Sequence, residues 1–126
     1  MYKRQVKRIL ERCGGSVHGL VHNTGGGVTK CLRVGRNIRY VKDHLPDPDP
    51  VFLLIQREAG VEWREMFEDY NMGIGFEVIV DPESAEEVLS VADSFKLGAQ
   101  VIGRCERGEG EKALIIRSRF GVFRYP

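Results

Sequence analysis

The stretch VHGLVHNTGGG, residues 17–27, joins a short segment that contains Val17, Leu20 and Val21 to three consecutive glycines. Residues 17–22 predict a short β-strand that ends at His22. Inside regular structure each glycine costs about 0.5–1 kcal/mol more than alanine, so three in succession indicate a tight turn or a backbone offered to a ligand. The next segment, VTKCLRV (28–34), is short and predicts one or two helical turns.

A strand, a glycine run and a helix start together form an arrangement that binds anions, because N–H groups without neighbouring Cβ atoms can converge on one ligand. His22 and Thr24 would add side-chain donors at the rim, and His22 could act as an acid, a base or a switchable cation. The P-loop spacing GxxxxGK[ST] is absent, although Lys30 follows the glycines. These residues alone leave open a plain glycine turn in which His22 is hydrogen-bonded locally.

A second glycine-containing stretch is NMGIGFEVIV, residues 71–80. Gly73 and Gly75 stand at the start of an apolar strand, where glycine weakens the strand unless something approaches the backbone closely. Asn71 could cap the preceding helix or reach a ligand, and a helix stop followed by a bulge is the simpler explanation. No metal site is predicted, because His18 and His22 on one strand would lie about 13 Å apart.

The remaining pattern predicts an α+β domain with a mixed β-sheet flanked by helices. Ser84 and Glu87 have the spacing of a capping box, and RGEGE (107–111) is typical of a hairpin turn. The proline-rich segment 46–50 predicts a rigid loop, and the tail 119–126 could either pack or fray. Periodicity predicts helices over 4–13, 51–59 (buried), 63–70 and 85 to near 98, and strands over 17–22, 38–45, 76–80, 99–106 and 112–118.

Composition indicates an ordinary globular chain of 126 residues, which predicts a single domain over residues 1–126. A net charge of +1 gives no reason to expect bulk attraction to nucleic acid or to a membrane. No apolar run approaches the roughly 20 residues of a membrane span. The three cysteines are far apart and form no CxxC motif, which predicts reduced thiols, no zinc site and a cytoplasmic location.

Two motifs in this order resemble the C-terminal half of the phosphoribosylformylglycinamidine cyclo-ligase family, also called aminoimidazole ribonucleotide (AIR) synthetases. GLVHNTGGG (19–27) is similar to the family's Gly-[Leu/Ile]-[Ala/Val]-His-x-Thr-Gly-Gly-Gly. EMFEDYNMGIG (65–75) is similar to its Glu-Met-x-x-x-[Phe/Tyr]-Asn-x-Gly-[Ile/Val]-Gly. The resemblance extends over about residues 5–118 and implies the fold of the AIR synthase C-terminal domain.

The resemblance also implies a function in de novo purine biosynthesis. Enzymes of this family use ATP and Mg²⁺ to activate the formyl amide oxygen of formylglycinamidine ribonucleotide. A nitrogen then attacks and closes the imidazole ring, and ADP and phosphate leave. The resemblance implies that the ribonucleotide lies against His22, Thr24, Gly25, Gly26, Gly27, Asn71, Gly73 and Gly75, with His22 also the candidate catalytic residue.

The chain departs from the family pattern in three ways. The Asn and the Pro-Arg pair that often follow the glycines are missing, so Arg33 or Arg36 would have to replace that arginine. Asn23 stands where the family usually has an apolar residue. The family's N-terminal domain, which holds most of the site for ATP and Mg²⁺, does not precede residue 1.

These departures leave three hypotheses open. The chain could be the substrate-side half of a split cyclo-ligase with a separate ATP-binding subunit, a stand-alone nucleotide- or phosphate-binding regulatory module, or an inactive truncated product. In each case we expect the isolated chain to be inactive. We also expect a homodimer that forms through an uncovered apolar face, with Phe76, Phe120, Phe123 and Tyr125 as candidates.

Overall fold

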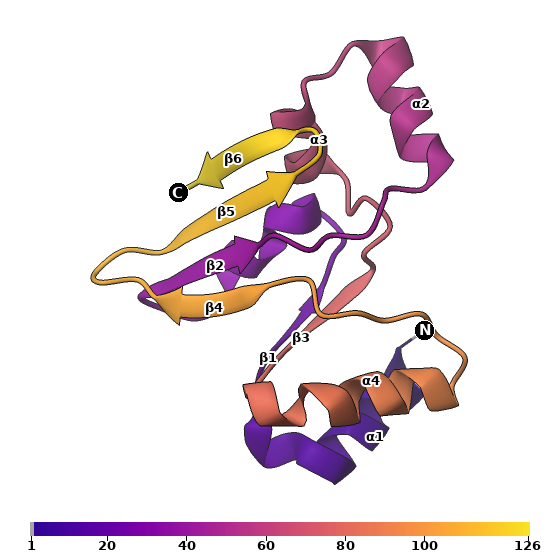
Figure 1. Cartoon of the computed structure of the whole chain (residues 1–126), viewed down its shortest axis with the longest axis vertical. Coiled ribbons are helices and arrows are strands. Elements are labelled where there is room, and N and C mark those ends of the chain that lie inside the picture. The colour runs from indigo at the N-terminus through magenta and orange to yellow at the C-terminus, as the bar shows by residue number, and fades with distance from the viewer. Residues whose placement is uncertain (1) are drawn as a thin grey trace. The chain divides into compact units, whose positions relative to one another are not determined.

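The structure, a computed structural model, describes residues 2–126 and divides into two compact units. The first contains the residues up to Leu20 together with Val78–Val101, and the second contains Val21–Glu77 and Ile102–Pro126. Strands β1 (Val17–His22) and β3 (Phe76–Val80) pair in a two-stranded sheet, and each runs from one unit into the other (Figure 1). The expected α+β class with mixed strand pairing is confirmed.

The first unit is built on two helices, α1 (Lys3–Cys13) and α4 (Ala85–Ser94). Apolar side chains on one stripe of each helix form its core, and Ile9, Val91 and Ala92 are buried there. An ion pair between Arg12 Nη1 and Glu87 Oε1, 2.9 Å apart, joins the two helices at the surface. Short 3₁₀ turns, η1 (Gly14–Ser16) and η3 (Pro82–Ser84), connect these helices to β1 and β3.

The second unit contains a four-stranded mixed sheet in the order β4-β2-β5-β6 (Figure 1). Its strands are β2 (Ile38–Lys42), β4 (Arg104–Arg107), β5 (Ala113–Ser118) and β6 (Gly121–Tyr125). Strand β2 runs parallel to β5, with Tyr40 opposite Leu114, and antiparallel to β4, with Tyr40 opposite Cys105. The 3₁₀ helix η2 (Gly27–Arg33) and the helices α2 (Pro50–Ala59) and α3 (Trp63–Asp69) complete the unit.

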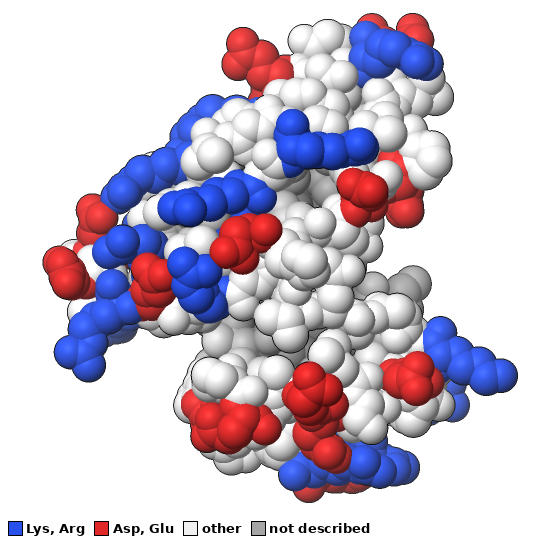
Figure 2. Space-filling view, viewed as in Figure 1, with Lys and Arg blue, Asp and Glu red and all other residues white. Residues whose placement is uncertain are grey.

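The core of the second unit lies between the sheet and the segments η2 and α3. Its fully buried side chains include Met66, Leu114, Ile116, Val28 and Cys31. Acidic and basic side chains are interspersed on the face shown in Figure 2. Of the helices described in residues 2–126, none is both long enough and apolar enough to cross a membrane.

The predicted hairpin at residues 107–111 is wrong, because β2 lies between the two strands that this turn connects. The Gly108 N–H donates to Asn37 O at 2.7 Å, so the turn packs against the start of β2. The preceding strand is also shorter than predicted and begins at Arg104. A Cβ on Gly103 would lie 1.9 Å from Val41 O, so the chain passes too close to β2 at this point for any side chain.

Two expectations about helices are also wrong. Ser84 makes no side-chain cap hydrogen bond, because the preceding turn η3 leads into α4 and the Ser84 N–H donates to Asp81 O. Helix α2 has the predicted bounds to within a residue, but none of its side chains is buried. Val51 and Leu54 are 52% and 48% exposed, so this apolar helix is not the core helix that its composition indicates.

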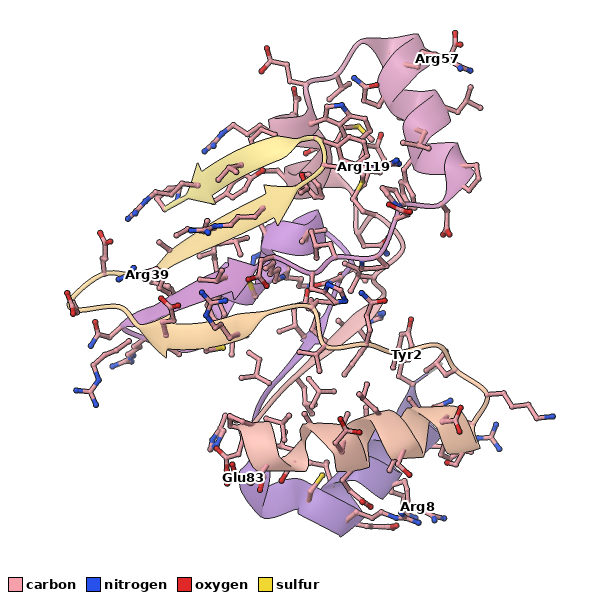
Figure 3. All side chains as sticks on the ribbon, viewed as in Figure 1. Tyr2, Arg8, Arg39, Arg57, Glu83 and Arg119 are labelled. Atoms are coloured by element: carbon pink, nitrogen blue, oxygen red, sulfur yellow. The ribbon has the colours of Figure 1, made fainter. Side chains whose placement is uncertain are left out.

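The C-terminal tail packs instead of fraying, since residues 121–125 form β6 against β5. The rings of Phe120 and Trp63 stack at 3.7 Å, and Tyr125 is buried. Arg119 lies at the turn between β5 and β6 (Figure 3), with its guanidinium 4.7 Å from the Phe120 ring centroid. Phe120 and Tyr125, which the sequence suggested as part of a dimer interface, therefore pack within the chain.

Candidate functional site

The segment His22–Gly27, called here the glycine loop, leaves β1 and leads into η2. Gly26 and Gly27 have left-handed backbones with φ of 96° and 52°, which residues with a Cβ rarely adopt. The Gly27 N–H donates to Thr24 O at 3.2 Å, and Thr29 donates to Gly26 O through both its N–H (3.1 Å) and its hydroxyl (2.7 Å). The loop is thus fixed by short-range hydrogen bonds.

Gly25 and Gly27 in the loop differ in their surroundings. A Cβ on Gly27 would lie 2.5 Å from Tyr70 O and 2.7 Å from Phe67 O, so Gly27 lets the loop pack against the end of α3. A Cβ on Gly25 would meet nothing within 4 Å. Gly27 therefore has a packing role and its N–H is already bonded, whereas Gly25 is the glycine whose backbone is open to a ligand.

The two motifs singled out in the sequence lie side by side in the second unit. The Asn23 N–H donates to Gly75 O at 3.0 Å, and Asn71 Nδ2 donates to Asn23 O at 3.3 Å. The Asn71 Oδ1 atom accepts from the Gly73 N–H at 2.9 Å, so the same side chain also shapes its own turn. The ring centroids of His22 and Phe76 are 6.0 Å apart. The motifs therefore form one continuous surface.

The backbone conformation of Gly73 and its contact with Asp49 both favour glycine at this position. Its φ is 95°, and a Cβ there would lie 3.3 Å from Asp49 Oδ2. The carboxylate of Asp49, in the proline-rich segment, therefore lies against the turn that contains the second motif. No sequence pattern indicated Asp49, because its neighbours in the chain indicate only a rigid loop.

Positive charge is present at the glycine loop. Lys30 Nζ donates to Thr24 Oγ1 at 2.7 Å, and an Arg33 guanidinium nitrogen lies 3.6 Å from where a Gly26 Cβ would be. Among residues 2–126 the N–H groups of Gly25 and Gly26 take part in no hydrogen bond. The loop thus combines two unengaged backbone donors with two nearby cations, a set of groups suited to an anion.

A buried ion pair lies beneath this surface. Lys42 Nζ is 2.8 Å from Glu77 Oε1, and both side chains are more than nine-tenths buried. Asn23 Nδ2 donates to Glu77 Oε2 at 2.6 Å and to Ile74 O at 3.0 Å, while Lys42 Nζ donates to Val28 O at 2.8 Å. This cluster was not predicted from the sequence, although Glu77 within the otherwise apolar strand FEVIV was a visible signal.

The buried thiol of Cys31 also lies near this ion pair. Burial raises the pKa of Cys31 to about 11, and the positive charge of Lys42 opposes that increase. A thiol that stays protonated and is 1% exposed is a poor nucleophile and a poor metal ligand. Within residues 2–126, no group of three or more His, Cys, Asp or Glu side chains could hold a metal ion.

Comparison with known proteins places this chain in a family. Residues 47–116 match the family described as "AIR synthase related protein, C-terminal domain", and the chain belongs to that family. The resemblance inferred from the two glycine motifs is therefore confirmed.

Its curated relatives include three proteins named phosphoribosylformylglycinamidine cyclo-ligase. The one from Methanocaldococcus jannaschii is 43% identical over 104 residues, which cover 82% of this chain and 30% of the relative. The one from Methanococcus vannielii is 44% identical over 106 residues, covering 84% and 30%. The one from Methanopyrus kandleri is 37% identical over 110 residues, covering 87% and 31%. The chain thus spans about 30% of the length of these relatives.

Proposed function

We propose that this chain is the substrate-side part of a phosphoribosylformylglycinamidine cyclo-ligase and binds the ribonucleotide phosphate at the glycine loop. The observation that carries the proposal is the junction of the two motifs, where Asn71 donates to Asn23 O and Asn23 donates to Gly75 O. Relatives that are 37–44% identical over most of this chain carry the name of that enzyme. The substrate is therefore a ribonucleotide whose ring is closed next to this surface.

The chemistry of the loop supports a phosphate ligand. The N–H groups of Gly25 and Gly26 are not engaged within the described chain, and each of these two N–H groups can donate to one phosphate oxygen. The Thr24 hydroxyl accepts from Lys30 Nζ, which leaves its own proton to donate. His22, at the end of β1, is the candidate acid or base. In this proposal Gly27, Gly73 and Gly75 shape the surface.

ATP and Mg²⁺ belong to a separate ATP-binding subunit in this proposal. Residues 2–126 contain no cluster of three or more His, Cys, Asp or Glu side chains that could hold a metal ion, and the proposal places Mg²⁺ with the nucleotide on that subunit. The chain's own contribution is to bind and orient the ribonucleotide. A cytoplasmic location and a homodimer remain predictions that accompany this function.

The proposal is tested by calorimetric titration of the chain with ribose 5-phosphate. Gly25→Val should abolish binding without loss of stability, since nothing lies within 4 Å of the added Cβ. His22→Ala should weaken binding by about 1.5–3 kcal/mol if its bond to the phosphate is charge-assisted, and Asn71→Ala should weaken it too.

Gly98→Val is the matched control, because Gly98 also has open space around it but lies outside the loop. If the folded loop variants bind ribose 5-phosphate as tightly as the wild type and the control, the glycine loop is only a turn.

A further inference from the structure

We propose that the buried cluster of Lys42, Glu77 and Asn23 is a positioning device that holds the glycine loop in its ligand-binding shape. The part of this proposal that concerns affinity rests on the proposed function. The cluster touches the loop region at Asn23, before the glycines, and at Val28, directly after them. One ion pair therefore holds both sides of the four residues Thr24–Gly27.

The connections are specific on each side. Before the glycines, Asn23 Nδ2 donates to Glu77 Oε2 at 2.6 Å, which ties the loop to β3. After the glycines, Val28 O accepts from Lys42 Nζ at 2.8 Å, which ties the loop to β2. The Lys42–Glu77 pair then connects β2 to β3 directly. The orientation of the Asn23 amide follows from these contacts, because both neighbours of Nδ2 are acceptors.

Stability alone is a poor explanation for this cluster. A buried ion pair is often no more stabilising than apolar residues of the same volume, because both charges lose their hydration. In addition, the Asn23 Oδ1 atom is buried and has no hydrogen-bond partner among the described residues. A cluster that leaves a buried acceptor unpaired is not optimised for stability, whereas its contacts on both sides of the loop suit it to hold the backbone of Thr24–Gly27 in one conformation.

A fixed loop matters for binding because the N–H groups of Gly25 and Gly26 must point at the same ligand. Neither residue has a side chain that packs, so the backbone of Gly25 and Gly26 is held by the bonds from Thr29 to Gly26 O and by the contacts on the two sides of the loop. A loop that samples other conformations binds more weakly, since part of the binding free energy is then used to order it. We therefore assign Lys42, Glu77 and Asn23 as positioning residues that do not touch the ligand.

The test compares the wild type with the double variant Lys42→Met/Glu77→Met, which replaces both charges by apolar side chains. We expect a urea unfolding midpoint close to that of the wild type. We also expect hydrogen exchange at the Thr24 and Gly27 amides to become at least about tenfold faster, while amides in β5 keep their protection. Affinity for ribose 5-phosphate should fall at least about tenfold.

A second variant covers the case in which the double variant does not fold. Asn23→Ala removes the side-chain connection to Glu77 before the glycines and leaves the Lys42–Glu77 pair and its bond to Val28 O. It should speed exchange in the loop and weaken binding in the same direction. Arg104→Met, which breaks the exposed ion pair with Asp43 in the same sheet, is the matched control and should change neither quantity.

Unchanged loop exchange in the folded variants would overturn the positioning role. Faster exchange with unchanged affinity would also overturn it, because the loop conformation would then not limit binding. If the wild type itself does not bind ribose 5-phosphate, the proposed function fails, and the exchange measurement still decides whether the cluster holds the loop.

Discussion

At the scale of single residues, Gly25 and Gly27 in the same glycine run differ in how closely other atoms pack against them. Gly27 has a left-handed backbone, and a Cβ there would overlap two carbonyl oxygens at the end of α3. Gly25 has neither constraint. The three consecutive glycines therefore include one that is needed for packing and one whose backbone is open to a ligand.

The pair Gly27→Ala and Gly25→Ala tests this difference. Gly27→Ala should lower the free energy of unfolding by about 2–4 kcal/mol, because it adds both overpacking and backbone strain. Gly25→Ala should change it by less than about 0.5 kcal/mol. Urea unfolding followed by circular dichroism measures both values, and equal effects of the two substitutions would contradict the packing role of Gly27.

At the scale of elements, β6 is held by more than its pairing with β5. The hydroxyl of Tyr125 donates to Arg64 O at 2.8 Å, which connects the last strand to α3. The ring of Phe123 lies 6.0 Å from that of Phe67 on the same helix. The tail therefore closes one side of the core of the second unit.

Substitution of Tyr125 by Phe measures the connection between β6 and α3. The change keeps the buried ring and removes the hydroxyl, so the free energy of unfolding should fall by about 1 kcal/mol. Val122→Thr on the same strand is the control, since Val122 is 67% exposed and should have little effect. Thermal or urea unfolding would show the difference, and an unchanged midpoint in Tyr125→Phe would argue against the bond.

At the scale of the whole molecule, three buried groups make stability depend on alkaline pH. Burial raises the pKa of Cys31 to about 11 and those of Tyr40 and Tyr125 to about 12. Each value is higher in the folded than in the unfolded chain, so the unfolded chain releases these protons first as the pH rises. The corresponding stability is fully present below pH 9 and is lost progressively up to about pH 12.

We therefore expect the urea midpoint to be steady up to about pH 9 and to decline above it. For Cys31, the difference from the ordinary value of 9.0 corresponds to about 2–3 kcal/mol once both states have ionised. Tyr125→Phe should reduce the decline above pH 10, because it removes one of the three groups. A midpoint that stays constant from pH 8 to pH 12 would refute the assignment.

Activity and assembly are also properties of the whole molecule. We expect the 126-residue chain alone to release no phosphate from ATP and Mg²⁺ above background, since it corresponds to about 30% of its cyclo-ligase relatives. Magnesium-dependent phosphate release by the pure chain would contradict this. A dimer is expected in light scattering at high micromolar concentration, and a monomer there would count against that expectation.

Much of this protein could be predicted from local patterns. The bounds of β1 and β3 match the segments 17–22 and 76–80, and α1, α2 and α3 begin and end within one residue of the predicted limits. The two motifs that define the candidate site were also evident, and the structure brings them together through Asn23 and Asn71. Such predictions succeed because periodicity and turn chemistry act over a few neighbouring residues.

Tertiary structure alone decided the order of the strands, the exposure of α2 and the ion pair beneath the glycine loop. The insertion of β2 between β4 and β5 replaced the predicted hairpin, because β2 pairs with both of its neighbours along their backbones. Lys42 and Glu77 are 35 positions apart, and no short-range pattern relates them. The sequence by itself determined the local elements and the motifs, whereas contacts between distant residues decided which strands pair, which glycine packs and which charges are buried together.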